Sequence, residues 1–358
     1  MPSARSASGW GSNLHDLTPA DLQAWAKGHG QPAYRVKQIL EALYQKGQSD
    51  PLSWSTLPTS LRHALAEEFP APGLEPLRKQ ESADGTVKWL WKLPDGQSVE
   101  TVMIPAEEAG RRTVCVSTQV GCAYRCGFCA SGMKGFLRDL TAGEIVQQVA
   151  QVDRALKPDR VSNIVFMGMG EPLSNYDNLI RAIRIINSPA GLRIGARKIT
   201  ISTVGLIPKM EQLAKEGLQL ELAVSLHAPN DAIRGKIMPV NKKYPMVRLM
   251  AACRAFVKAT KRLITFEYIL IDGLNDQPHH AEELAGRLKG ILCKVNLIPC
   301  HPIPGTPWGR PPEERMIAFE KKLKEKGIVA TLRTSRGLDI EGACGQLRLR
   351  HETSTEVE

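Results

Sequence analysis

The sequence predicts an α/β protein with a closed or incomplete barrel of parallel strands, preceded by a small helical domain and a β-hairpin. Three observations support this fold class. From Arg112 onward, short apolar segments typical of strands alternate with helical segments, which is the pattern of parallel strands joined by right-handed crossovers. Residues 18–69 show mainly helical spacing. Between these regions, Pro94-Asp95-Gly96 separates two strand-like segments and is a hairpin turn signal.

The composition is that of a globular protein with an anionic partner. The chain has 358 residues, of which 42% are hydrophobic, enough for one large domain plus a smaller one. It lacks both the apolar run that a membrane helix needs and a signal peptide, so we expect a cytoplasmic protein. Eight cysteines without an export signal indicate metal or redox chemistry rather than a disulfide framework. The net charge of +10 makes nucleic acid the leading candidate partner.

Residues 1–72 are expected to form an N-terminal helical accessory domain, of which about the first 12 residues are Ser- and Gly-rich and predicted to be disordered. Thr18 is the predicted N-cap of the first helix, with Pro19 at its first position. Apolar residues at helical spacing predict a second helix over 34–43 and a third over 57–69. Three aromatic residues are expected in the core of this domain: Trp25, Tyr44 and Trp54.

Residues 73–110 are expected to form a β-hairpin extension. The Pro and Gly density over 70–76 predicts a linker, and the two hairpin strands are predicted over 86–93 and 97–104. Glu100 falls in the second strand. By default Glu100 is a solvated strand residue, unless its carboxylate faces a site.

Residues 111–347 are expected to form the catalytic domain, and residues 348–358 a disordered tail. Because the chemistry of such folds sits at the carboxyl ends of the strands, motifs at those ends are candidates for a site. The candidate strands are 113–117, 163–167, 198–203, 221–226, 265–271, 294–298 and 329–333, and Thr141 to Glu144 fits a capping box that opens the first helix between them.

Three cysteines form the strongest motif. Cys122, Cys126 and Cys129 have C-x3-C-x2-C spacing, and Gly121 and Gly127 allow the tight turns that bring three thiolates together. A structural zinc needs four protein ligands, whereas three cysteines on an iron–sulfur cubane leave one iron open. An open iron can bind and reduce S-adenosylmethionine (SAM), and the spacing, with Phe128 before the last cysteine, resembles the radical SAM superfamily. The alternative is a zinc knuckle completed by a distant Cys or His.

Further motifs follow the predicted strands. Gly168-Met169-Gly170-Glu171-Pro172 offers exposed backbone groups and a carboxylate that can accept from an ammonium group, although alone it is also an ordinary glycine-rich turn. Ser202 ends one strand, and Ser225-Leu226-His227 end the next. A lone histidine is more often structural, but this one shares the expected rim with the cysteine loop.

Several segments together carry a closer resemblance. Val116 to Cys122, Gly168 to Leu173, Ser225 to Ala228 and Gly342 to Leu347 are similar to the RlmN/Cfr family of radical SAM RNA adenine methyltransferases, and the match runs from about Pro32 to Leu347. The RlmN branch is the closer one. The resemblance implies a partial (β/α)6 radical SAM barrel, a [4Fe-4S] cluster held by Cys122, Cys126 and Cys129, and two SAM molecules per turnover.

The resemblance also assigns roles to three residues outside the cluster motif. It implies that Cys344 accepts a methyl group and presents it as S-methylcysteine, because the electron-poor C2 of adenine does not attack SAM directly. A radical formed on this methyl group adds to C2 and joins protein to RNA. Glu100 then removes the C2 proton, and Cys115 attacks the sulfur of Cys344, ending as a disulfide that must be reduced.

By the same resemblance a further set of residues binds SAM: Gly170, Glu171, Ser202, Ser225, Leu226, His227 and His301. His301 departs from the family pattern, which commonly has Asn there, but a histidine can still make one hydrogen bond. Cys253, Cys293 and Cys300 match no family role and are interpreted as structural.

The predicted function is formation of 2-methyladenosine in the peptidyl transferase centre of 23S rRNA and in tRNA beside the anticodon. The resemblance implies an electron donor such as flavodoxin or ferredoxin, and we expect a monomer. The N-terminal domain and three basic clusters, at 193–198, 234–243 and 258–262, are candidates for RNA contact. Two alternatives stay open: Cfr-like methylation of C8 of the same rRNA adenosine, and a zinc-stabilised RNA-binding protein without catalysis.

Overall fold

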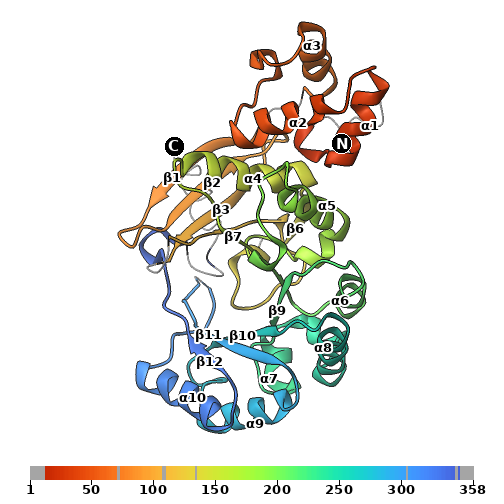
Figure 1. Cartoon of the computed structure of the whole chain (residues 1–358). Coiled ribbons are helices and arrows are strands. Elements are labelled where there is room, and N and C mark those ends of the chain that lie inside the picture. The colour runs from red at the N-terminus through yellow and green to blue at the C-terminus, as the bar shows by residue number, and fades with distance from the viewer. Residues whose placement is uncertain are drawn as a thin grey trace.

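A computed structural model gives the fold and describes residues 13–70, 73–106, 110–133, 135–303, 305–342 and 346. The sequence predicts disorder for about the first twelve residues and for the tail over 348–358. Both segments, with residue 347, lie outside the described residues. A group of N-terminal helices sits at one end of the molecule, and the strands and helices of the rest of the chain extend away from it (Figure 1).

The N-terminal part is helical, as the sequence predicts. Thr18 caps the first helix through a reciprocal pair of hydrogen bonds with Asp21. The second helix continues as a short π-helix, which the sequence did not indicate. Trp25, Tyr44 and Trp54 are all buried. The helices are α1 (Pro19–Gly28), α2 (Tyr34–Leu40), the π-helix (Glu41–Gln45) and α3 (Thr59–Glu68).

Polar contacts join this helical part to the following helices. The backbone N–H of Gly143 donates to the carboxylate of Asp16 at the start of α4 (Ala142–Ala155). Arg181 of α5 (Tyr176–Asn187) donates to the carbonyl of Asp16 and to the carboxylate of Asp21. The N-terminal helices are therefore fixed to the two helices that precede and follow the strand β7 (Asn163–Phe166).

Ten strands form one sheet in the order β1-β2-β3-β4-β7-β8-β9-β10-β11-β12. The first four pair antiparallel and include the predicted hairpin, β2 with β3. β1 was not predicted; it begins at Glu75, inside the segment expected to be a linker. The antiparallel strands are β1 (Glu75–Glu81), β2 (Val87–Lys92), β3 (Ser98–Pro105) and β4 (Arg112–Cys115).

From β4 onward every strand pair in this sheet is parallel, with helices between most of the strands, as the alternating pattern predicts. All seven predicted strands are present, with ends that differ by one or two residues. The capping box of Thr141 and Glu144 opens α4. The remaining elements are β7 (Asn163–Phe166), β8 (Ile199–Thr203), α6 (Ile207–Leu213), β9 (Glu221–Ser225), α7 (Asp231–Ile237), α8 (Met246–Thr260), β10 (Ile264–Leu270), α9 (Pro278–Leu288), β11 (Cys293–Pro299), α10 (Glu313–Glu325) and β12 (Ala330–Leu332).

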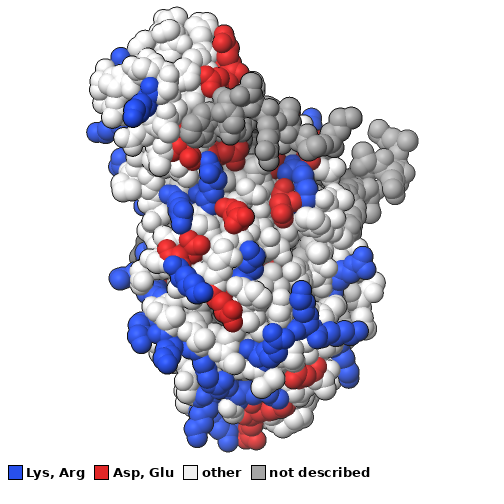
Figure 2. Space-filling view, turned by 90° about the vertical axis from the view of Figure 1, so that its right-hand side faces the viewer, with Lys and Arg blue, Asp and Glu red and all other residues white. Residues whose placement is uncertain are grey.

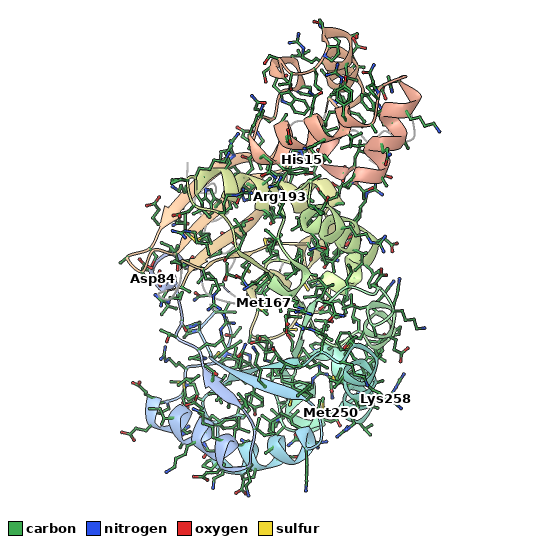
Figure 3. The ribbon with its side chains drawn as sticks, viewed as in Figure 1. His15, Asp84, Met167, Arg193, Met250 and Lys258 are labelled. Carbon is green, nitrogen blue, oxygen red and sulfur yellow. The ribbon has the colours of Figure 1, made fainter. Side chains whose placement is uncertain are left out.

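A separate two-stranded antiparallel sheet positions the cysteine motif. β5 (Gln119–Gly121) pairs with β6 (Phe136–Asp139), and the three cysteines lie in the loop between them. This small sheet was not predicted. Figure 3 places Met167, the residue after β7, near the centre of the molecule, between the hairpin half and the half formed by β10 to β12.

The surface carries many cationic side chains. Figure 2 shows Lys and Arg gathered on the lower half of one face, where α6 and α8 lie in Figure 1, and a more mixed distribution above. In the part of the chain that the structure describes, no helix has the length and apolar character needed to cross a membrane.

Candidate functional site

The cysteine loop is held by backbone hydrogen bonds. The N–H of Cys122 donates to the carbonyl of Gly135 at 3.0 Å, and the N–H of Gly127 donates to the carbonyl of Ile237 at 2.9 Å. Gly121 enters the loop with φ of +75°, and a Cβ there would lie 1.9 Å from the oxygen of Gly135. Glycine is therefore required at 121 for β5 and β6 to approach each other.

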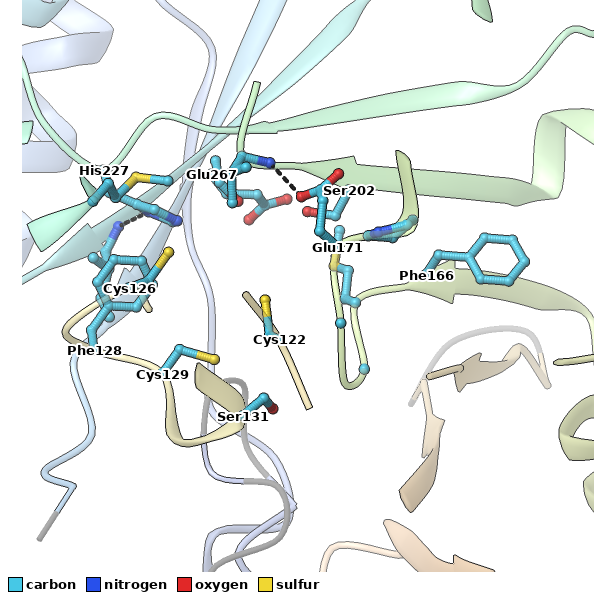
Figure 4. A pocket seen from close by; sticks show the side chains of 18 of the residues that line it. Cys122, Cys126, Phe128, Cys129, Ser131, Phe166, Glu171, Ser202, His227 and Glu267 are labelled. Carbon is cyan, nitrogen blue, oxygen red and sulfur yellow. Dashed lines mark hydrogen bonds between the residues drawn. The ribbon is translucent and has the colours of Figure 1, made fainter. Parts of the chain in front are cut away.

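The three cysteines open into one cavity at the carboxyl ends of the parallel strands (Figure 4). This is the edge of the sheet where the fold class predicts a site. Of the predicted SAM-binding residues, five line this cavity: Gly170, Glu171, Ser202, Ser225 and His227. The remaining wall is largely apolar and includes Phe128, Phe166, Val204, Met238, Ile269 and Ile298.

The thiol set fits an iron–sulfur cluster better than a single ion. Burial raises the pKa of Cys122 to about 12, and that of Cys126 well above its ordinary value, with neighbouring thiols adding to both. A bound cationic centre reverses such shifts by stabilising thiolates. No three His, Cys, Asp or Glu side chains of the described residues could hold one metal ion. Each thiolate of a cluster binds a different iron, so its ligands stand further apart than the ligands of a zinc.

Glu171 is fixed by backbone donors. Its side chain is 2% exposed, and its two oxygens accept hydrogen bonds from the N–H groups of Leu173 at 3.1 Å and Val204 at 2.8 Å. Burial raises the pKa of Glu171 to about 7, although these hydrogen bonds act to lower it. Gly170 precedes it with φ of +98°, where a Cβ would meet the side chain of Gln119 at 2.5 Å. The glycine turn therefore brings Glu171 against the cavity.

His227 is a neutral, buried acceptor. Its Nδ1 accepts the backbone N–H of Ile269 at 3.0 Å, and its own carbonyl accepts from Asn275 Nδ2 at 2.8 Å. Burial, with the charge of Arg234, lowers the pKa of His227 to about 3. The ring packs edge-on against Phe128 of the cysteine loop, with centroids 4.6 Å apart. Leu226, predicted beside it, is buried and does not line the cavity.

Arg234 corrects a sequence interpretation. It was grouped with a basic cluster that could follow an RNA backbone, yet its side chain is fully buried. Its guanidinium donates to the carbonyls of Leu226 at 3.2 Å and Val204 at 2.8 Å, and to Asn241 Oδ1 at 3.0 Å. Five donors in a rigid fork suit this task. Arg234 therefore links the residue that follows β8 to the residue that follows β9.

A second cavity adjoins the first, and Met167 and Ile298 line both. Cys115, at the end of β4 and buried, lines the second cavity. His301 also lies there rather than in the first cavity, and its Nε2 is 2.8 Å from Ser335 Oγ. Two guanidinium groups complete this cavity, those of Arg333 and Arg336.

Glu100 is buried, contrary to its default interpretation as a solvated strand residue. It lines a third cavity, where Lys88 Nζ lies 3.4 Å from its Oε1. The same Lys88 Nζ donates to the carbonyl of Glu341 at 3.3 Å. Glu100 and Val102 point to one face of β3, and Cys115 is the cross-strand partner of Val102. Glu100 and Cys115 therefore share a face of the sheet.

Cys344 lies outside the described residues. Gly342, two positions before it, lines the second cavity with Cys115. Of the cysteines interpreted as structural, Cys253 and Cys300 are buried, and Cys293 is partly buried.

Two residues at the site were missed from the sequence. The sequence pattern predicts a surface position for Arg234 and gives no role to Glu267, which lies inside a mostly apolar strand segment, Ile264–Leu270. Glu267 is buried and lines the first cavity. The charge of Glu267 is itself a sequence signal of a site, because a carboxylate within a buried strand needs a partner.

Known proteins are similar to this sequence over nearly its whole length. The sequence model of the Radical SAM superfamily matches residues 116–285. A probable dual-specificity RNA methyltransferase RlmN of Geobacillus kaustophilus is 48% identical over 340 residues, which cover 94% of this chain and 93% of that protein. A protein of the same name from Bacillus thuringiensis subsp. konkukian is 48% identical over 341 residues, which cover 95% of this chain and 94% of that protein.

The fold is shared as well. The crystal structure of a radical SAM methyltransferase from Sphaerobacter thermophilus has a TM-score of 0.91 and 49% sequence identity, and the match covers 94% of this chain and 99% of that chain. The predicted α/β radical SAM fold class is confirmed by this similarity.

Proposed function

Because the chain belongs to the RlmN family of radical SAM RNA methyltransferases, we propose that it methylates C2 of adenine in 23S rRNA and in tRNA beside the anticodon. The family uses a [4Fe-4S] cluster and SAM. One observation carries the proposal to this chain. The cavity with Cys122, Cys126 and Cys129 shares Met167 and Ile298 with the cavity of Cys115, so a group made in one can act in the other.

The first cavity supplies the cofactor site. Cys122, Cys126 and Cys129 would hold the cluster, and Glu171 lies where it can accept from the ammonium group of SAM. A reduced cluster held by these three cysteines would supply the electron for cleavage of SAM, which is the source of the radical chemistry. The apolar wall and the buried backbone around Glu171 exclude water from this chemistry.

The second and third cavities supply the residues that act on RNA. Cys344 would carry the methyl group on its sulfur and present it to C2. After the adduct has given up one electron, Glu100 would take the C2 proton. The Cys115 thiolate would then attack the sulfur of Cys344 and break its bond to the CH2 group on C2, which takes up a proton and becomes the methyl group, while the two cysteines are left as a disulfide. Two contacts support this assignment: Gly342 lines the cavity of Cys115, and Lys88 lies between Glu100 and the carbonyl of Glu341.

Outside partners complete the proposal. The reaction needs a one-electron donor, for which flavodoxin or ferredoxin is suitable. We expect the protein to act in the cytoplasm, where both RNA substrates are made. We also expect it to act as a monomer.

Locating the methyl group on RNA tests the proposed position. RNA from cells with and without the gene is digested and its nucleosides are separated and identified by mass spectrometry. We expect 2-methyladenosine in 23S rRNA and tRNA only when the gene is present. A product containing only 8-methyladenosine would show Cfr-like chemistry instead, because the two branches use the same cysteines.

Metal analysis of Cys122→Ala separates the enzyme from a zinc-stabilised RNA-binding protein. The anaerobically purified wild type is expected to contain iron and sulfide and to absorb as a brown protein, and Cys122→Ala to lose most of both. Cys293→Ala, which changes a cysteine outside the motif, serves as the control and should keep its iron. Stoichiometric zinc in a colourless wild type would contradict the proposal.

A further inference from the structure

Lys88 of β2 is a buried cation to which the proposed mechanism gives no chemical task. It is 6% exposed, whereas a lysine is almost never fully buried unless it is paired. Its ammonium group lies 3.4 Å from Oε1 of Glu100, and both side chains are 7% exposed. The same ammonium group donates to the carbonyl of Glu341 at 3.3 Å. Two segments far apart in the sequence, β3 and the segment that ends at Glu341, therefore share one buried charge.

The register of the sheet places Lys88 on the same face as Cys115. Lys88 pairs with Val102 of β3, and Val102 pairs with Cys115 of β4. Side chains at paired positions point to one face, so these three residues form a row across three strands. Glu100, two residues before Val102, points to that face as well. The proposed base, the releasing thiol and Lys88 therefore share one face of the sheet.

The opposite face of the hairpin packs the core. Trp89 and Trp91 point to that face, are buried, and stack with ring planes 6° apart. Trp91 Nε1 donates to Thr101 Oγ1 at 3.0 Å. The apolar packing of the hairpin thus lies on the side away from Lys88, whereas Lys88 and Glu100 line the third cavity. The ion pair is therefore placed toward the cavities rather than within the apolar core.

The ion pair suits the step that Glu100 is proposed to perform. A carboxylate can take a proton from C2 only while it is charged and held in one place. A buried carboxylate that loses its cation either takes up a proton or turns toward water, and neither state can act as the base. Lys88 supplies the opposite charge and neither gives nor takes a proton itself. Its bond to Glu341 also ties the base to the chain three residues before Cys344.

We propose that Lys88 is a positioning residue for removal of the C2 proton. Its ammonium group keeps the Glu100 carboxylate charged and holds it on the Cys115 face of the sheet. Its bond to the Glu341 carbonyl fixes this pair relative to the segment that leads to Cys344. The inference deepens the proposed function and rests on the role given there to Glu100.

Single-turnover release of RNA from the reconstituted holoprotein tests this role. Each protein is first methylated at Cys344 with SAM, which also shows that it is folded, and labelled RNA, SAM and reductant are then added. A denaturing gel follows the covalent protein–RNA species as it forms and disappears. Lys88→Met should form this species and release its RNA about a hundredfold more slowly than the wild type, because the positioned base is lost.

Lys92→Met is the matched control. Lys92 lies on the same strand and face as Lys88, but its ammonium group pairs with Glu75 at 3.5 Å in an exposed position. Loss of a cation from this strand at the surface should leave release at the wild-type rate. Equally slow release by Lys92→Met and Lys88→Met would overturn the inference.

A double-mutant cycle separates positioning from a structural role. If Lys88 acts through Glu100, release by Lys88→Met/Glu100→Gln should be no slower than release by Glu100→Gln alone. If Lys88 only stabilises the sheet, the two effects multiply, which overturns the inference. Release by Lys88→Met at the wild-type rate overturns it as well.

A second variant covers misfolding. If Lys88→Met is not methylated at Cys344, Lys88→Gln replaces it in the cycle, because its amide keeps a donor without the charge, and the same outcomes decide. Glu100→Gln that releases RNA at the wild-type rate overturns the inference but leaves the methyl carrier in place. A wild type that never forms the protein–RNA species contradicts the proposed function itself, and the inference with it.

Discussion

At the scale of the residue, His227 acts as a positioned acceptor. Its Nδ1 is 3.0 Å from the N–H of Ile269, and its φ of 57° is in the left-handed region. Because the lowered pKa keeps the ring neutral near pH 7, the Nδ1 lone pair remains available. Ile269 lines the first cavity, so this hydrogen bond fixes part of the wall of that cavity.

Substitution of His227 tests this role. His227→Leu removes the acceptor and places a branched side chain at positive φ, so the free energy of unfolding should fall by about 2–4 kcal/mol. His227→Asn keeps an acceptor and tolerates positive φ, so its loss should be about 1 kcal/mol or less. Anaerobic urea denaturation measures both. Equal losses in the two variants would show that packing, rather than the hydrogen bond, is what matters.

Cys115 gives a second prediction at this scale. If its thiolate releases RNA from Cys344, Cys115→Ala should form the covalent protein–RNA species and keep it. A denaturing gel with labelled RNA should show a slow-migrating band that the control Cys293→Ala does not accumulate. Recovery of methylated RNA from Cys115→Ala at the wild-type yield would remove Cys115 from the mechanism.

Individual site residues were predictable to different degrees. The spacing predicts that Cys122, Cys126 and Cys129 act together, because residues close in sequence can be recognised as a group without knowledge of the fold, and all three line one cavity. Glu267 and Arg234 were missed because their meaning depends on burial, and burial depends on strands far away in sequence. His301 is expected at SAM from the resemblance, but it lines the neighbouring cavity, where its Nε2 lies 2.8 Å from Ser335 Oγ.

At the scale of the element, the turn between β1 and β2 holds the C-terminal segment. Ser82 Oγ donates to Asp339 at 2.6 Å, and Gly337 N–H donates to Asp84 at 2.9 Å. Figure 3 labels Asp84 at the outer edge of the sheet, beside this segment. The segment continues to Gly342, which lines the cavity of Cys115. The turn therefore positions the chain that leads to Cys344.

The pH dependence of stability tests this contact. Partial burial alone would raise the pKa of Asp84, but hydrogen bonds from Thr86, Gly337 and Ser82 outweigh it and lower the pKa to about 2. A carboxyl with a lowered folded pKa stabilises the protein above its unfolded value near 3.9 and loses that contribution as pH falls toward 2. The stability difference between wild type and Asp84→Asn should therefore be full at pH 6 and should shrink below pH 4. A difference that stays constant from pH 6 to pH 3 would contradict this account.

Elements differed in how readily they could be predicted. α1 and α4 were found from Thr18 and Thr141, because capping is local chemistry. β1 was missed because nearly all of Glu75–Glu81 is polar and exposed. It is an edge strand with a register shift after Pro76, and an edge strand can carry proline and charge without an apolar pattern.

At the scale of the whole molecule, the charge distribution concerns the RNA substrate. Arg248, Arg254, Lys258 and Lys261 are exposed on and just after α8. The cationic region of Figure 2 lies where Figure 1 shows α6 and α8. Lys and Arg side chains on one face attract the phosphate backbone without reading its sequence. A long polyanion can therefore lie along this cationic face.

Charge reversal on α8 tests this surface. Replacing Arg254 and Lys258 by Glu should weaken binding of a 23S rRNA fragment by about tenfold at low salt. The slope of the binding constant against salt concentration should also fall, by the amount expected for the loss of roughly two phosphate contacts. Lys321→Glu on α10 changes an exposed cation elsewhere and serves as the control. Equal weakening by the control would mean that only net charge matters.

The proposed reaction requires the protein to carry the methyl group on its own sulfur before RNA receives it. The most direct measurement incubates the anaerobically reconstituted protein with SAM bearing a deuterated methyl group, then adds RNA, and follows both by mass spectrometry. The label should appear first on the peptide that contains Cys344 and afterwards in 2-methyladenosine. Labelled 2-methyladenosine from Cys344→Ser, or a Cys344 peptide that never carries the label, would contradict the account.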